Sequence, residues 1–434
     1  MKQKKILLTL ACVFATLWLT AQEAPKSLSL SLQEAQDYAI AHNVDLRNSS
    51  LQIREAKLKE WQSIATMLPQ VTTNFQYMNM CGYTMELGMG PMKTNIAMPP
   101  YGNFGLQTAV TINGQTVLAV LLQQTAKDMQ DINFEQTQHN LRINVMQSYL
   151  AVLVTESIVA LLDSSLSNLQ ALADMTQRSV EVGVSEQTAA DQILVRVSAI
   201  KNSLNANKRS VQVAYNALRL MLDIDSDTEL HLTQSLEELL SAEAALTMLS
   251  KDFDINRNFS YRLQLKNTEL AKRQLILSTM EYSPTLSAYY QYSARKYFSN
   301  ESTMNMQAPN TVGLTLSLPL FTSFKSGASI TEKKLAYERA LNTLDYTQDA
   351  LGVQDKQLRF NLANSYETYI NEVKNIEVTK RVFNSTSNKY QYGVASSLEL
   401  TNASNDLIAA QNTYVQAVLS LVNAQVEFMK FMNE

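Results

Sequence analysis

The chain has 434 residues, with 36 Lys and Arg against 40 Asp and Glu, and this nearly even balance argues against a basic nucleic-acid-binding surface. Its 11 Gly and 8 Pro are few for this length, which favours long uninterrupted elements over many short turns. Neither zinc-finger spacing nor a Gly-x4-Gly-Lys-Ser/Thr phosphate loop occurs, so the common metal-finger and nucleotide-binding motifs are absent from the sequence.

The first residues predict a signal peptide over 1–21. Three lysines precede an apolar run at 6–19, and the small residue Ala21 ends the segment. The alternative is a membrane-anchor helix, but the apolar run is short for a span. No later segment has ~18 uninterrupted apolar residues, and the remaining cysteine, Cys81, cannot form an internal disulfide. The mature chain is therefore predicted to be exported, and either soluble or held in a membrane by something other than helices.

The sequence contains two halves with the same order of features. Pro69 and Pro284 each follow a helix-like stretch and open an alternating one, 215 residues apart. Gly-Val pairs at Gly183 and Gly393 recur with an offset of 210. Fixed offsets of this kind indicate an internal duplication. The predicted repeats are residues 22–252 and 253–434.

Four stretches alternate between apolar and polar residues, as a half-exposed strand does. They lie near 70–80, 104–113, 285–295 and 311–321. In the last of them Leu316 is expected near the middle on the apolar side, with Ser317 on the polar side. Each stretch is about as long as a tilted membrane strand of ~9–11 residues. A soluble sheet packed under helices would give the same pattern, and the signal in one segment is weak.

The final segment predicts a long packed helix, since apolar residues step by three and four along it. These residues are Leu400, Ala403, Leu407, Ala410, Tyr414, Ala417, Leu421, Ala424, Phe428 and Phe431. Subtracting 210 gives a series that is apolar everywhere except at Asn207. The helix before Gly183 is predicted over about 118–180, on the order of 90 Å at ~1.5 Å per residue. The sequence thus predicts coiled-coil packing of long helices.

Four strands cannot close a barrel, because the smallest known barrels need ~8. Open sheet edges in hydrocarbon would leave backbone groups without hydrogen-bond partners. If the strands lie in lipid, several chains must therefore share one barrel.

Three segments resemble the TolC family of outer-membrane efflux proteins: Asn43-Val-Asp-Leu…Leu68-Pro69, its copy ending at Pro284, and YQYGVASSLELTNASNDLIAAQ at 390–411. The resemblance implies a mainly α protein with a transmembrane β part. It implies a homotrimer with a twelve-stranded barrel in outer-membrane lipid and a periplasmic tunnel of long helices. The turns at Gly183 and Gly393 would close that tunnel. The implied function is a passive exit duct, supplied by an inner-membrane pump through a periplasmic adaptor, with no enzyme activity and no cofactor.

The resemblance also suggests residues of the closed tunnel mouth, although the match is partial. A tyrosine three residues before the second-repeat glycine belongs to a closing network in the family, and Tyr390 stands there. The family's arginine partner, two residues after the glycine, is Ala395 here, so that link is absent.

Acidic rings are implied six and nine residues after the glycines. In the second repeat these positions are Glu399 and Asn402, and in the first they are Ala189 and Gln192. One carboxylate ring, from Glu399, is therefore expected. The alternative is that Glu399 is a solvent-exposed first-turn acid favoured by the helix dipole.

Soft sulfur ligands crowd the first strand end and the loop after it. They are Met78, Met80, Met85, Met89, Met92, Met98 and Cys81, with Met304 and Met306 in the corresponding second loop. Thioethers and thiols suit monovalent copper or silver, but a flexible loop that uses adaptable side chains explains them as well. No metal site is predicted.

Catalytic groupings are missing from the sequence. His42, His139 and His231 are isolated, and His42 is expected to pack or cap a helix. The competing hypothesis for the whole chain is a soluble periplasmic coiled-coil structural or adaptor protein. The feature that separates a channel from this alternative is the apolar face of the strands, where charged residues are missing.

Overall fold

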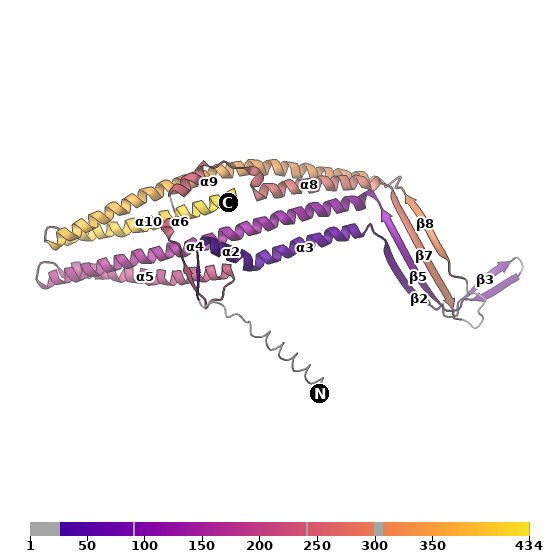
Figure 1. Ribbon diagram of the computed structural model, residues 1–434, viewed down its shortest axis with the longest axis horizontal. Coiled ribbons are helices and arrows are strands. Elements are labelled where there is room, and N and C mark those ends of the chain that lie inside the picture. Colours follow the sequence, from indigo (N-terminus) through magenta and orange to yellow (C-terminus); the bar gives the residue numbers. More distant parts are fainter. Residues whose placement is uncertain (1–26, 90–91, 240–241, 299–306, 434) are drawn as a thin grey trace, which may run out of the picture. The chain divides into compact units, whose positions relative to one another are not determined.

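The computed structural model describes residues 27–89, 92–239, 242–298 and 307–433 (Figure 1). The predicted signal peptide, Met304 and Met306 lie outside these residues. The chain divides into two compact units, each built from both predicted repeats. We call Met1–Asn48, Glu135–Asn258 and Leu351–Glu434 the helical unit, and Ser49–Phe134 with Phe259–Ala350 the sheet unit. The predicted repeats follow one another along the chain, whereas each compact unit combines segments from both of them.

Long helices dominate the chain, as predicted. The longest are α4 (Gly114–Glu181), α5 (Gln187–Leu222), α9 (Lys325–Gln391) and α10 (Ser397–Met432). The helix predicted over 118–180 is α4, a continuous helix of 68 residues. The shorter helices are α2 (Leu32–His42), α3 (Val44–Ala65), α6 (Leu236–Leu239), α7 (Ala242–Ser250), α8 (Phe259–Thr279), η1 (Ile255–Arg257) and η2 (Met280–Tyr282).

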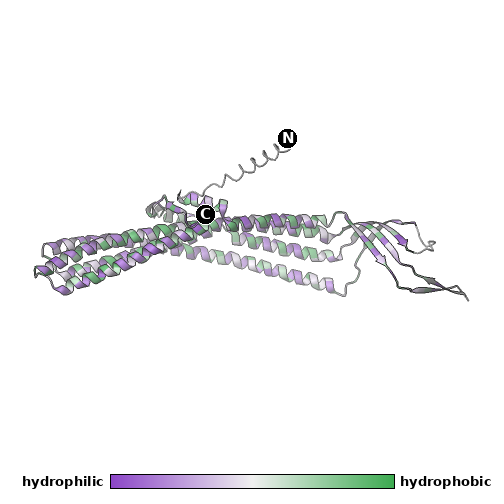
Figure 2. Cartoon of the chain, turned by 90° about the horizontal axis from the view of Figure 1, so that it is seen from below, coloured by the Kyte–Doolittle hydropathy of each residue, from purple (hydrophilic) through white to green (hydrophobic). Residues whose placement is uncertain are grey.

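The core of the helical unit consists of the predicted three-four series. Of the ten predicted positions in α10, nine are buried and Tyr414 is half-buried. In the earlier copy Ile193, Ile200 and Leu218 are buried. Apolar and polar residues alternate around these helices in Figure 2. The heptad pattern therefore marks a seam that this unit buries within one chain.

One 18-residue stretch of α4 is, by length and composition alone, apolar enough to cross a membrane. This differs from the prediction that no later segment is apolar enough. This stretch is 39% buried, and helices in the cores of soluble proteins can be equally long and apolar. In α4 the side chains of Ile143, Val145, Tyr149 and Val152 are buried in the protein. Packing within the helical unit explains the apolar composition of this helix.

A small parallel sheet also belongs to the helical unit. It joins β1 (Ser27–Leu30) to β6 (Glu229–Leu232), about 200 residues apart in the chain. Tyr149 Oη donates a hydrogen bond of 3.1 Å to the Leu30 carbonyl. Ser31 then starts α2 with a capping box to Glu34. Four-residue strands are too short to show a period, and the sequence did not predict them.

The sheet unit contains one antiparallel sheet of four strands in the order β2-β5-β7-β8. The strands are β2 (Gln70–Met78), β5 (Tyr101–Ile112), β7 (Thr285–Tyr297) and β8 (Asn310–Ser317). Strands β2 and β7 begin directly after Pro69 and Pro284, as predicted. Strands β2 and β8 form the two edges.

The last strand is shorter than predicted. The expected stretch at 311–321 ends as a strand at Ser317, since Pro319 has no N–H and restricts the residue before it. Leu316 lies opposite Leu286, the second residue of β7. Leu316 is therefore at the strand end next to the helices, and the sequence-based placement near mid-strand was wrong.

A hairpin that the sequence did not predict follows β2. Its strands are β3 (Thr84–Met89) and β4 (Met92–Ala97). The first methionine-rich loop therefore has regular structure rather than being a flexible loop throughout. Tyr101 Oη donates to Met78 Sδ at 3.1 Å, and Cys81 is exposed. Among the described residues no group of three His, Cys, Asp or Glu side chains could hold a metal.

Candidate functional site

The strand register places all four predicted apolar series on one face of the sheet. Directly opposed residues of antiparallel strands share a face. Val71 opposes Thr108, Thr108 opposes Tyr290, and Tyr290 opposes Val312. The predicted polar series fall together on the other face by the same register. The alternation seen in each segment thus becomes two continuous surfaces.

The apolar face is uncovered. Phe75 is 79% exposed and Val312 is 78% exposed, and the residues between them on this face are exposed or half-buried. The exposed apolar residues of this face are Val71, Phe75, Tyr77, Ile112, Leu286, Tyr290, Val312, Leu314 and Leu316. Apolar surface in water costs roughly 25 cal/mol per Å², and large exposed patches mark contacts with protein or membrane. This face is suited to an apolar surrounding that the chain itself does not supply.

The polar face carries short polar side chains and two glycines, Gly105 and Gly313. Thr111 and Ser287 hydroxyls lie 3.1 Å apart, and Ser293 Oγ donates to Asn103 Oδ1 at 3.1 Å. A Cβ at Gly313 would overlap the ring of Tyr289. Glycine at this position therefore lets the tyrosine lie along the sheet.

The helical unit presents two tip turns with the same backbone. Gly183 and Gly393 have φ of +76° and +70°, a left-handed conformation that favours glycine. The Gly183 N–H donates to the Val180 carbonyl at 2.9 Å, and the Gly393 N–H donates to the Tyr390 carbonyl at 3.0 Å. The two turns marked by the Gly-Val pairs therefore have closely similar backbone geometry.

The side chains after the two turns differ. Ser396 caps α10: its N–H donates to Glu399 Oε2 at 2.9 Å, and its Oγ accepts from the Glu399 N–H at 3.2 Å. The equivalent residue before α5 is Glu186, which makes no side-chain cap. Instead Glu186 Oε2 accepts from Thr188 Oγ1 at 3.1 Å. The Glu399 carboxylate thus serves the start of its own helix, and its side chain is exposed.

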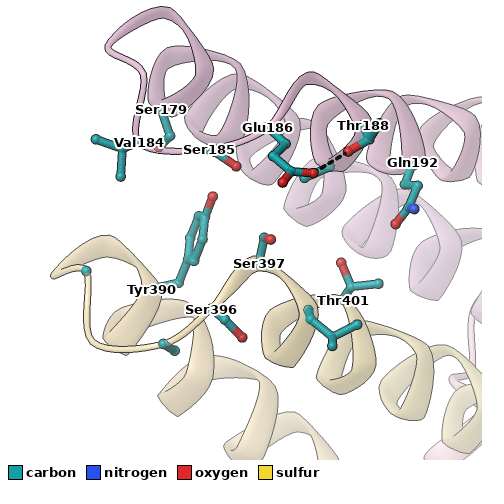
Figure 3. Close-up of a pocket in the computed structure, with 14 residues that line it drawn as sticks. Ser179, Val184, Ser185, Glu186, Thr188, Gln192, Tyr390, Ser396, Ser397 and Thr401 are labelled. Carbon is teal, nitrogen blue, oxygen red and sulfur yellow. Dashed lines mark hydrogen bonds between the residues drawn. The ribbon is translucent and has the colours of Figure 1, made fainter.

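A groove of about 540 Å³ lies between the two tip turns (Figure 3). The predicted gate residues Ala189, Gln192 and Tyr390 line it, together with Gly393 and Ala395. Figure 3 shows the Tyr390 side chain pointing from its own turn toward the other one. Its hydroxyl is buried and has no hydrogen-bond partner among the described residues. Ala395 lines the same groove, and its methyl side chain offers this hydroxyl no hydrogen-bond partner.

Two predicted gate residues lie outside this groove. Glu399 and Asn402 are exposed on α10 and are not among its lining residues. The charged residue that does line the groove is Glu186, which the sequence did not single out. The offset of 210 aligns Glu186 with the cap Ser396, so the repeat itself carried a signal for this position.

The histidines have local partners. His42 stacks on Tyr38 at 4.2 Å, and its Nδ1 lies 2.9 Å from the Tyr38 carbonyl, in line with the expected packing role. His139 Nε2 lies 3.3 Å from the Lys430 carbonyl, and burial lowers the pKa of its imidazole.

Known proteins resemble this chain in both sequence and fold. Residues 266–434 match the family model described as outer membrane efflux protein. Outer membrane protein TolC of Salmonella enteritidis is 21% identical over 414 residues, covering 92% of this chain and 79% of that protein.

Two solved structures share the fold at 13% identity. VceC of Vibrio cholerae has a TM-score of 0.76, with 93% of this chain and 96% of that one covered. CusC has a TM-score of 0.78 and covers 95% of both chains. Together with the two tip turns and the four-stranded sheet, these matches show that the chain resembles outer-membrane efflux proteins such as TolC in sequence and shares the fold of VceC and CusC.

Proposed function

We propose that three copies of this chain form the outer-membrane exit duct of a tripartite efflux or secretion system. The observation that carries this proposal is a sheet with one uncovered apolar face and two open edges. The apolar face would contact lipid, the polar face would line the lumen, and the edges β2 and β8 would pair with neighbouring copies. The helical unit would lie in the periplasm. The duct is passive and carries out no catalysis.

The partners follow from the family rather than from contacts in this chain. A periplasmic adaptor and an inner-membrane pump would deliver substrate to the duct. Residues 1–21 would direct export and be removed, and the repeats at 22–252 and 253–434 would each contribute two strands and one tip turn. A soluble coiled-coil protein is not favoured, because its sheet would expose the whole apolar face to water.

The test combines location with stoichiometry. Membrane fractionation should place the full chain with outer-membrane proteins, and native mass measurement after detergent extraction should give three copies. Heating should convert the assembled form into a monomer that migrates differently on a gel. A folded monomer in the soluble periplasmic fraction would contradict the proposal.

We also propose that Glu399 lines the closed periplasmic mouth, where threefold symmetry would bring three carboxylates together. Rings of acidic side chains at a constriction attract cations. Glu399→Gln is a clean test because glutamine also completes a capping box, so the helix start is retained while the charge is lost. We expect reduced cation preference and weaker block by divalent ions in planar bilayers. Unchanged selectivity and block would leave Glu399 with its capping role alone.

A further inference from the structure

The four strands of the sheet carry two charged side chains, and these are neighbours. Every residue of β2, β5, β7 and β8 is described, and the Asp, Glu, Lys and Arg residues among them are Arg295 and Lys296. Both lie near the end of β7. Thr285 begins that strand beside the helices, so Arg295 is ten residues further, roughly 33 Å along it.

The register places the two charges on opposite faces. Arg295 lies opposite Asn103, which lies opposite Gln76, and all three are on the polar face. Lys296 lies opposite Gly102 on the apolar face, in the row of Tyr77. A lysine at the border of a lipid-facing surface can extend its ammonium to the headgroups. The arginine is directed to the face proposed to line the lumen.

Two tyrosines orient the Arg295 side chain. Its guanidinium carbon is 4.6 Å from the centroid of the Tyr101 ring, and Nη1 donates to Tyr297 Oη at 3.4 Å. The two rings are 5.5 Å apart. Within the described residues no carboxylate lies within ion-pair distance of Arg295. Cation–π contact holds the group in place but leaves its full positive charge.

We propose that Arg295 is a charge-selecting residue at the outer mouth of the duct, favouring the passage of anionic solutes. This inference rests on the proposed function, because threefold symmetry turns one guanidinium into a ring of three. Charged rings in a pore select ions of opposite sign, and their field reaches ~8 Å at physiological ionic strength. The remaining polar-face residues are uncharged, so the sheet offers no acidic residue to cancel the ring.

The test measures reversal potential in planar bilayers across a potassium chloride gradient. For Arg295→Gln we expect the chloride-to-potassium permeability ratio to fall about threefold, the size expected for loss of a nearby charge in water. Lys296→Gln is the matched control: it removes the same charge from the next residue on the opposite face, and the ratio should not change. Arg295→Lys should keep the wild-type ratio.

A second variant covers the case in which Arg295→Gln assembles poorly. Asn103→Asp keeps the arginine and places a carboxylate directly opposite it, where it can still accept from Ser293. It should lower the ratio in the same direction. A ratio unchanged in both variants, or changed equally by Lys296→Gln, would overturn the inference. Wild-type protein that forms neither trimers nor channels would instead refute the proposed function, and this inference with it.

Discussion

The helical unit and the sheet unit treat apolar side chains in opposite ways. In the helical unit Leu218 is 0% exposed, whereas Val312 of the sheet unit is 78% exposed. Both residues lie in regular apolar series, one with a period near 3.5 and the other with a period of 2. The helices complete their core within one chain, but the sheet face needs lipid or protein from outside. Hydrophobic periodicity therefore identifies a face, and only its surroundings decide what that face contacts.

The largest effect is expected when a fully buried side chain of the helical unit is shortened. Leu218→Ala empties a fully buried position of α5 and should lower the free energy of unfolding by ~2–5 kcal/mol. Leu220→Ala removes the same atoms two residues away, where the side chain is 80% exposed, and should stay within ~0.5 kcal/mol. Urea unfolding of the detergent-solubilised protein, followed by circular dichroism, measures both. Equal losses would mean that assembly buries Leu220 as well.

In the sheet unit the expected cost of a charge depends on face and depth. Val312→Arg places a charge on the apolar face near the middle of the sheet, at a cost of ~2–4 kcal/mol if that face lies in lipid. Leu316→Arg, at the strand end, should cost only ~0–1 kcal/mol. Gel quantification of assembled trimer in outer membranes should rank Val312→Arg lowest.

Thr311→Arg is the control on the polar face, since Thr311 lies next to Val312 and opposite Gln291. It should assemble like the wild type, because a water-filled lumen accepts charge. If Thr311→Arg and Val312→Arg reduce trimer equally, the assignment of the two faces is wrong.

The smallest expected effect compares the two tip turns. Ser396→Ala removes the side-chain cap of α10 and should cost ~1 kcal/mol. Glu186→Ala removes a residue that makes no cap at the start of α5, so the cost should be close to zero. The shift in thermal unfolding midpoint of each variant checks this difference. A larger loss for Glu186→Ala would indicate that its carboxylate holds a neighbouring chain or turn.

Local patterns predicted much of this fold, because they depend on residues close in the chain. Alternation gave β2, β5 and β7, and the three-four series gave the seams of α5 and α10. The glycines at 183 and 393 marked turns that require positive φ. The same reasoning failed at the end of β8: the strand ends at Ser317, before Pro319, although the alternation of apolar and polar residues continues.

The sequence by itself determined the long helices, the four amphipathic strands and the two tips. The tertiary structure alone decided that the four apolar series share one face, because strand register joins residues far apart in the chain. It also paired β1 with β6, placed Glu186 in the tip groove, and left Glu399 outside it as a capping residue. These outcomes depend on how helices and strands meet in space, and a period of two or 3.6 residues carries no information about that contact.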